Sequence, residues 1–291
     1  MANRSPFRRA REREQFIANY DEVMRGWPVP FTECMVETAY GQTHTVVCGE
    51  PSAPPLVLLH GASATSAMWR PVIAALSAQY RCYCLDTITD TSKSVLTSEI
   101  SSPDDYVDWL RQVFDALGLT NARVVGLSYG GWLAAQLGLR APELVSHLVL
   151  LTPAGTLAPL TIQFYVRMMT PILLRSPARV RAAVQWLAST PDACSDPTVK
   201  LIVVSMLTSR PFRRPVLPSV LTDAELRRLT MPVTVVIGDR DVIYRGGPVA
   251  TLARARRLIP QVSTRSMPGA NHMLTVDCPD ELITELTRAL A

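Results

Sequence analysis

The chain has 291 residues and a formal net charge of +4, and 48% of its residues are hydrophobic. This length is sufficient for a large buried core, and the small basic excess, without a basic face that carries a recognition element, gives no reason to expect a nucleic-acid partner. No apolar run approaches the length that spans a bilayer, and the first thirty residues lack the apolar segment of a secretory signal. We therefore expect a cytoplasmic protein with no membrane partner.

The cysteines provide a second indication of the compartment. The six cysteines show no C-x-x-C pair and no spacing typical of metal ligands. Cysteines of this kind, in a chain without a secretory signal, are typical of reduced thiols in the cytosol. The sequence therefore predicts no metal site.

The first segment of the chain, residues 1–30, is predicted to be an N-terminal helical arm, with its helix over 13–24. The next segment, 31–47, has the pattern of a hairpin that turns near Gly41 and Gln42, and we expect it to form the antiparallel edge of a sheet. Five arginines cluster near the start of the arm: Arg4, Arg8, Arg9, Arg11 and Arg13.

Strand and helix signals then alternate along the chain. A helix is expected over 101–117, because Ser102 and Pro103 are good residues for a helix start. Short apolar runs are typical of buried parallel strands, and they occur at 56–60, 82–86, 123–128 and 146–151. The alternation predicts an α/β fold with a doubly wound, mostly parallel sheet that is flanked by helices.

The pattern changes over 155–229, where prolines are frequent and the alternation of strands stops. Apolar and aromatic residues recur between the prolines, which indicates helices, and strand signals return at 232–237 and 261–267. We therefore expect a core of residues 31–154 and 230–291, with residues 155–229 inserted as a helical cap. The alternative is a group of surface helices that bury an ordinary satellite core.

The most informative motif is Gly126-Leu127-Ser128-Tyr129-Gly130, a G-x-S-x-G pentapeptide between a strand-like run and a helix-like run. A serine on such a sharp turn is exposed to a cleft, and the flanking glycines allow neighbouring backbone to approach. We expect Ser128 to be a nucleophile; a plain glycine-rich turn is the alternative.

A nucleophilic serine needs a base, and the chain has four histidines. His272 lies in a polar loop after the run 261–267 and is the only one placed after the serine and the expected acid, so it is the candidate base. His44 and His147 lie inside apparent strands and are interpreted as packed or surface residues. His60, at a strand end, is interpreted as structural.

The acid that orients the base is expected after the strand at 232–237. Asp241 is preferred, because three residues past Gly238 the chain has room to turn a carboxylate toward the histidine loop. Asp239 is interpreted as a turn residue. Asp277 follows His272 in the chain and therefore breaks the expected order.

Hydrolysis through a tetrahedral intermediate needs two donors for the oxyanion. The first expected donor is the backbone N–H of Tyr129, the residue after the nucleophile. The second is the backbone N–H of Ala62, in the loop that follows the strand at 56–60. A plain strand-to-helix turn is the alternative for this loop.

The set of His60-Gly61, the serine motif, Asp241 and His272 resembles the α/β-hydrolase superfamily, from about Thr43 to the C-terminus. The resemblance implies an α/β-hydrolase fold, a Ser-Asp-His triad and no cofactor. Three further segments resemble bacterial serine carboxylesterases that act on esters of bulky aryl acids, and the serine-dependent macrolide esterases: 85–94, 126–132 and 151–154. One departure is Thr89, which stands where the family pattern Asp-x-x-Gly-Asp has glycine.

These features predict a serine ester hydrolase that acts through an acyl-enzyme on a small-molecule ester or lactone that is apolar or bulky, and the lactone of a macrolide antibiotic is one candidate. A general short-chain or aryl-acid carboxylesterase is an alternative. An acyltransferase, a carbon–carbon bond hydrolase and a perhydrolase would use the same residues, and a ligand receptor on a hydrolase scaffold is a further alternative. The sequence does not fix the oligomeric state.

Overall fold

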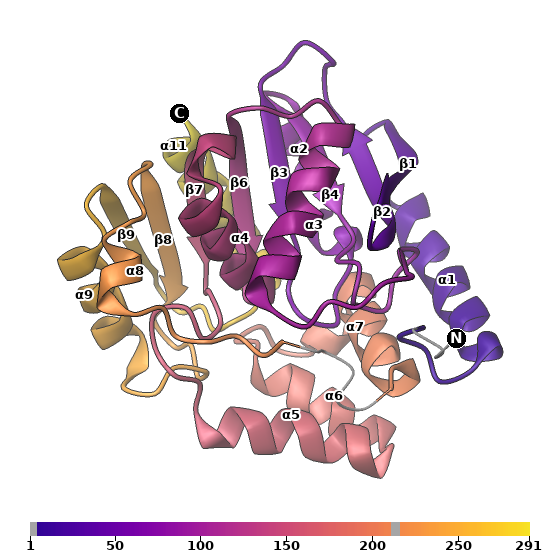
Figure 1. The fold of residues 1–291 in the computed structure, drawn as a ribbon. Coiled ribbons are helices and arrows are strands. Elements are labelled where there is room, and N and C mark those ends of the chain that lie inside the picture. Colours follow the sequence, from indigo (N-terminus) through magenta and orange to yellow (C-terminus); the bar gives the residue numbers. More distant parts are fainter. Residues whose placement is uncertain (1–4, 211–215) are drawn as a thin grey trace.

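The computed structural model describes residues 5–210 and 216–291. In these ranges nine strands form one sheet, in the order β1-β2-β4-β3-β6-β7-β8-β9, with β5 paired to β2 (Figure 1). The strands are β1 (Phe31–Thr38), β2 (Gly41–Cys48), β3 (Pro55–Leu59), β4 (Arg81–Leu85), β5 (Val95–Leu96), β6 (Ala122–Leu127), β7 (Val145–Leu151), β8 (Val233–Gly238) and β9 (Val262–Met267).

The pairing directions confirm the predicted fold class. Strands β4, β3, β6, β7, β8 and β9 pair in parallel, and β1 and β2 form the antiparallel edge that the sequence predicts. The hairpin turns at residues 39–40, slightly before the predicted position, because Thr38 pairs with Gly41. The backbone of Gly41 has φ of +127°, a conformation that glycine adopts without steric cost.

Helices cover both faces of the sheet (Figure 1). One face packs against α3 (Pro103–Ala116), α4 (Tyr129–Arg140), α8 (Asp223–Leu226) and α9 (Gly247–Leu258). The other packs against α1 (Ala10–Arg25), α2 (Ile73–Ser77) and α11 (Pro279–Leu290). Ser102 and Asp105 form a capping box, and Pro103 lies between them at the first helical position. These residues fix the start of α3 as predicted.

The N-terminal helix α1 packs on the body of its own chain. Phe16 and Tyr20 are fully buried, and α1 makes its main contacts with α7 (Pro197–Thr208). The backbone of Phe7 forms an antiparallel bridge with Ser209. The segment before the sheet is therefore tied to the helices that precede β8. Arg4 lies outside the described residues.

Between β7 and β8 the chain forms α5 (Ile162–Leu174), α6 (Pro177–Trp186) and α7, which lie together below the sheet in Figure 1. Their shared interior is a small apolar cluster of Val180, Val184, Val199, Val203 and Met206. Helix α8, in contrast, packs with α3, α4 and α9 against one face of the sheet. The division of the chain into arm, core and cap stays a prediction. The short helix α10 (Leu274–Asp277) follows the histidine loop.

Candidate active site

Ser128 lies at the turn between β6 and α4, and its backbone has φ of +55° and ψ of −112°. A serine in this region is strained, and such strain is typical of functional turns. The turn is possible because of its glycines. A Cβ on Gly126 would lie 2.2 Å from the carbonyl oxygen of Gly130, and a Cβ on Gly130 would lie 2.1 Å from that of Leu59. The motif therefore needs glycine at both positions.

The structure brings Ser128, His272 and Asp241 together. Nε2 of His272 lies 2.9 Å from Oγ of Ser128, and Nδ1 of the same ring lies 3.0 Å from Oδ2 of Asp241. All three residues are buried. The other oxygen of the carboxylate, Oδ1, accepts a hydrogen bond of 3.1 Å from the N–H of Ile243, which fixes its orientation. This chain of contacts has the geometry of a nucleophile, a base and an orienting acid.

The loop that carries His272 is held by the neighbouring chain. The N–H of His272 donates to the carbonyl of Leu187 at 3.0 Å and to Oδ1 of Asn271 at 2.9 Å. The N–H of Asn271 donates to Oδ2 of Asp277 at 2.8 Å. Leu187 follows α6, so a residue outside the sheet holds the loop of the base. Sequence reasoning missed these contacts, because none of them is signalled by a local motif.

The two remaining aspartates have supporting positions. Asp239 is exposed, and its Oδ1 accepts the N–H of Gly269 at 2.8 Å. This bond reaches the histidine loop and not the amides of its own turn, which a turn residue would contact. Asp277 also accepts the N–H groups of Ser189 and Thr190, at 2.8 and 2.9 Å. It therefore joins the segment after α6 to the histidine loop and does not contact the ring of His272.

The segment after β3 lies beside the serine. Gly61, Ala62 and Ser63 line the same cavity as Ser128, and so does Tyr129, at the start of α4. The N-terminus of a helix carries partial positive charge, which favours a developing oxyanion. The assignment of the Ala62 and Tyr129 amides as the two donors stays a prediction.

His60 has the structural position that the sequence predicts. Its Nδ1 lies 2.8 Å from the carbonyl oxygen of Gly61, and its Nε2 accepts the N–H of Thr87 at 2.9 Å. The ring therefore joins the loop after β3 to the loop after β4. Thr89, in the second loop, bonds through its hydroxyl to Tyr106 at 2.7 Å. His147 lies on β7 and is half-buried.

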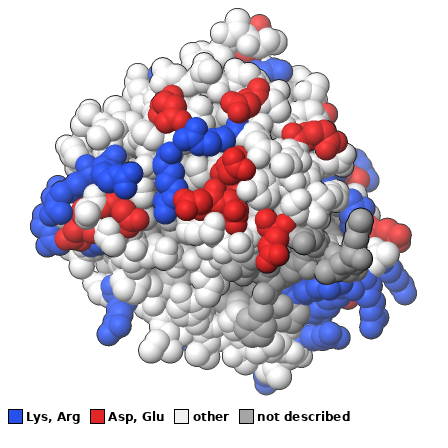
Figure 2. Space-filling model, viewed as in Figure 1, with Lys and Arg blue, Asp and Glu red and all other residues white. Residues whose placement is uncertain are grey.

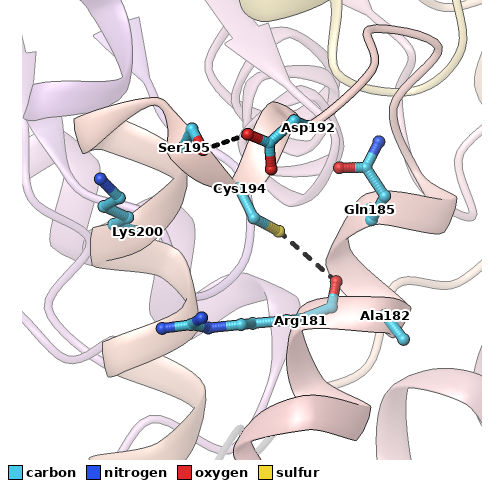
Figure 3. A pocket seen from close by; sticks show the side chains of 7 residues that line it. All are labelled: Arg181, Ala182, Gln185, Asp192, Cys194, Ser195 and Lys200. Atoms are coloured by element: carbon cyan, nitrogen blue, oxygen red, sulfur yellow. Dashed lines mark hydrogen bonds between the residues drawn. The ribbon is translucent and has the colours of Figure 1, made fainter.

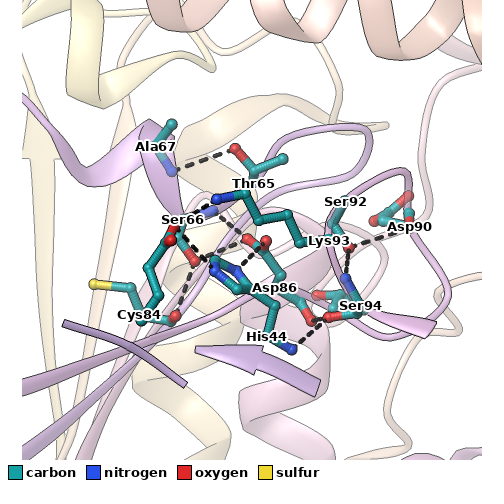
Figure 4. A network of polar contacts seen from close by, with 12 residues as sticks. His44, Thr65, Ser66, Ala67, Cys84, Asp86, Asp90, Ser92, Lys93 and Ser94 are labelled. Atoms are coloured by element: carbon teal, nitrogen blue, oxygen red, sulfur yellow. Dashed lines mark hydrogen bonds and ion pairs between the residues drawn. The ribbon is translucent and has the colours of Figure 1, made fainter. Parts of the chain in front are cut away.

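His44 is more than the ordinary packed residue expected from the sequence (Figure 4). Its Nδ1 lies 2.8 Å from Oδ2 of the buried Asp86, and its Nε2 lies 3.2 Å from Oε1 of Glu33. Burial alone lowers the pKa of His44, but Asp86 and Glu33 outweigh it, so its pKa is raised above the ordinary value. Burial also acts on Asp86, yet His44 holds the pKa of that carboxyl below its usual range. The contact therefore favours the protonated form of His44 and the ionised form of Asp86.

The other oxygen of Asp86 holds the turn that follows the Ala62 loop. Oδ1 accepts the N–H of Ser66 at 2.7 Å and its hydroxyl at 2.8 Å. The Ser66 hydroxyl is also 2.8 Å from the carbonyl oxygen of Cys84, on β4. Asp86 and β4 therefore anchor the segment after β3 through Ser66.

The cavity over Ser128 is apolar and has a volume of about 290 Å³. Methionines enter it from several elements, and none of the described residues that line it is Asp, Glu, Lys or Arg. Apolar walls around a few polar groups are typical of small-molecule sites. The lining includes Met68, Leu127, Leu160, Phe164, Tyr165, Met168, Met169, Ile172, Val184, Leu187, Ile202, Met206, Leu217 and Met273.

A second hollow, of about 300 Å³, lies between α6 and α7 (Figure 3). Its lining includes Arg181, Asp192, Cys194 and Lys200, but no histidine that could act as a base. The thiol of Cys194 lies 3.4 Å from the carbonyl oxygen of Arg181, and burial raises its pKa, so it is not an activated nucleophile. This hollow does not have the chemistry of the serine site.

Within residues 5–210 and 216–291, no group of three or more His, Cys, Asp and Glu residues is arranged to hold a metal ion. No helix of this part of the chain has both the length and the apolar character needed to cross a bilayer.

Comparison with known proteins identifies the family. The profile of the alpha/beta hydrolase family matches residues 56–285. An uncharacterized carboxylesterase, nap, from Bacillus subtilis (strain 168) is 33% identical over 270 residues, which cover 91% of this chain and 88% of the relative. Carboxylesterase YbfK of the same organism is 31% identical and covers 91% of this chain and 90% of its own. The crystal structure of naproxen esterase from Bacillus subtilis superposes with a TM-score of 0.90, at 32% identity, over 96% of this chain and 98% of that one. The chain belongs to the alpha/beta hydrolase family.

Proposed function

We propose that the protein is a serine carboxylesterase that hydrolyses uncharged esters with a bulky, apolar acyl group. The observation that carries this proposal is the contact of Ser128 with His272 at 2.9 Å, and of His272 with Asp241 at 3.0 Å, at the base of an apolar cavity. Both Bacillus relatives carry the name carboxylesterase, which supports the reaction class.

In the proposed mechanism, Oγ of Ser128 attacks the ester carbonyl while Nε2 of His272 accepts its proton. Asp241 orients the ring and stabilises the imidazolium, and the amides of Ala62 and Tyr129 stabilise the oxyanion. The bond between the carbonyl carbon and the alcohol oxygen breaks, and the alcohol leaves with the proton from His272. Water then attacks the acyl-enzyme by the same route and releases the acid and the free serine.

The cavity supports the substrate class. Its walls carry no charged side chain among the described residues, so a charged acyl group would be desolvated without a partner. Its volume, about 290 Å³, is at the lower end of the range of small-molecule pockets. One apolar ring system fits such a space, whereas a macrolide ring is larger and needs a wider cavity. Opening of a macrolide lactone is the same chemistry, and we place it second for this reason.

The test is product analysis by mass spectrometry with purified protein and two substrates: an aryl ester of a bulky apolar acid and a sixteen-membered macrolide lactone. We expect the free acid from the aryl ester, and no product from the Ser128→Ala variant. A macrolide that gains the mass of one water only with the active serine would move the lactone to first place. Turnover by Ser128→Ala above a trace would contradict the assignment of the nucleophile.

Two measurements distinguish the remaining alternatives. Added alcohol competes with water for the acyl-enzyme, so an ester product in excess of acid would identify an acyltransferase. A fluorophosphonate should label the peptide that contains Ser128 and stop turnover. A stable acyl adduct after one turnover, without release of acid, would identify a receptor on a hydrolase scaffold.

A further inference from the structure

The outer side of α5 carries an unusual row of exposed apolar side chains. Ile162, Val166 and Leu173 are 81%, 57% and 53% exposed. Their spacing of four and seven residues places them on one side of the helix. None of the three lines the cavity over Ser128. This row is called the α5 strip below.

The opposite side of the same helix is also apolar, because Phe164, Met168 and Ile172 line the cavity. Met169 lines it as well, although its spacing of seven residues from Ile162 places it on the side of the strip. Only Gln163, Arg167 and Thr170 interrupt the apolar sequence of this 13-residue helix. The cavity accounts for these lining residues but not for the three exposed side chains of the strip. Exposed apolar patches with a polar rim mark contact sites for proteins or membranes.

The charged residues of the segment that carries the strip have one sign. Arg167 on α5, Arg175 at its end and Arg179 at the start of α6 are exposed, and the guanidinium of Arg167 lies 4.9 Å from the ring centre of Trp186. The sequence has no Asp or Glu from 144 to 191. The lower part of the molecule in Figure 2, where α5 lies, is white with blue side chains at its edge. Burial and then the charge of Arg175 lower the pKa of Arg8, while Glu12 raises it, so one further cation and one carboxylate lie near this margin. The surface is therefore complementary to an anionic partner.

We propose that the α5 strip and its three arginines dock on the surface of an anionic phospholipid bilayer. The three apolar side chains enter the boundary between headgroups and acyl chains, and the arginines contact the lipid phosphates. Helix α5 is about 20 Å long at 1.5 Å per residue, and it lies flat on the membrane in this arrangement.

A second copy of the chain fits this surface less well. A two-fold symmetric contact places the same patch on both partners, so the arginines would face their own copies with no acidic residue of α5 or α6 between them. The sequence predicts no membrane partner because no segment is long enough to span a bilayer. A surface contact requires no such segment, and the exposed strip is evident only once the other side of α5 is placed over the cavity.

The test is sedimentation of purified protein with large vesicles of phosphatidylcholine, with and without phosphatidylglycerol. We expect binding to the anionic vesicles that weakens as salt is added. Each arginine near a charged membrane contributes about fivefold in partitioning. The combined variant Arg167→Gln, Arg175→Gln and Arg179→Gln should therefore bind about a hundredfold more weakly.

Two further variants separate the contribution of the apolar side chains, and of the position of the arginines, from that of net charge. The variant Ile162→Ser, Val166→Ser and Leu173→Ser should also lose binding, although its charge is unchanged. The matched control is Arg227→Gln, Arg228→Gln and Arg257→Gln, which removes three exposed arginines on or next to α8 and α9. It should bind as the unmodified protein does. Thermal unfolding of each variant verifies that the fold is retained.

The outcomes are distinct. No binding of the unmodified protein to anionic vesicles overturns the proposal, and so does an equal loss in the control variant. The protein could also fail to bind vesicles but form concentration-dependent dimers that are lost in the variant Ile162→Ser, Val166→Ser and Leu173→Ser. This result would assign the strip to self-association and overturn the lipid assignment. None of these readouts uses ester hydrolysis, so the result is independent of the proposed function.

Discussion

Replacement of Asp241 by asparagine tests the proposed triad most directly. The carboxylate has two fixed roles, because Oδ1 accepts the N–H of Ile243 and Oδ2 contacts Nδ1 of His272. In Asp241→Asn the amide oxygen must remain toward Ile243, since an NH₂ group there would oppose a buried N–H. The NH₂ group then faces Nδ1, which must lose its proton. Nε2 consequently carries the proton and cannot accept the one from Ser128.

The size of the effect follows from these contacts. Loss of the charge-assisted bond to the imidazolium costs about 1.5–3 kcal/mol, and reversal of the amide would leave a buried donor unsatisfied at about 1–3 kcal/mol. Together these give about 2.5–6 kcal/mol of transition-state stabilisation. At 1.36 kcal/mol per factor of ten, we expect kcat to fall by about 10²- to 10⁴-fold.

The assay is kcat for an aryl ester, with thermal unfolding as the measure of fold. The matched control is Asp239→Asn, the same chemical change two residues away, where the carboxylate is exposed and holds only the N–H of Gly269. We expect the control to change kcat by less than about threefold, as is typical of surface substitutions. A loss below tenfold in Asp241→Asn, or an equal loss in Asp239→Asn, would refute the reasoning.

Three other predictions concern the surroundings of the serine. In Gly130→Ala the new Cβ would lie 2.1 Å from the carbonyl oxygen of Leu59, so we expect a melting temperature lower by about 5 °C or more; an unchanged melting curve would contradict the described turn. Because Asp86 raises the pKa of His44, protonated His44 stabilises the fold below about pH 6.5, and this contribution is lost as the pH rises through the raised pKa. Urea unfolding should show a deficit in His44→Gln at low pH that shrinks at higher pH, and a deficit independent of pH would be the opposing result. In Met168→Trp the larger ring occupies the cavity, so kcat/KM should fall by about tenfold for a bulky ester and little for an acetyl ester; equal losses for both esters would argue against a substrate pocket at Met168.

The sequence predicts much of this fold because its signals are local. Each parallel strand is a short apolar run, and the structure places the strands within one or two residues of the predicted limits. The serine motif also encodes its geometry locally, since Gly126 and Gly130 are needed by contacts within the turn and with the end of β3. The order of serine, acid and base along the chain then left a single histidine to test.

The remaining features depend on contacts between distant segments. His44 and Asp86 are 42 positions apart in sequence, and no local pattern indicates that β2 reaches the end of β4. The sequence separates Asp239 from Asp241 only by their distance from the end of the strand; the contacts that fix their roles are a bond from Gly269 to one carboxylate and from Ile243 to the other. The carbonyl of Leu187 gives no sequence signal at all, because every residue has one.

The contact of Leu187 with the histidine loop has a consequence for turnover. Its carbonyl accepts the N–H groups of both His272 and Met273, at 3.0 and 3.2 Å, and its side chain lines the cavity. Any motion that lifts the end of α6 to admit a ligand also releases the backbone of the base. A ligand therefore cannot enter by that route while His272 transfers a proton. A molecule too large to be enclosed would hold the site open and act as a competitive inhibitor, however reactive its ester bond.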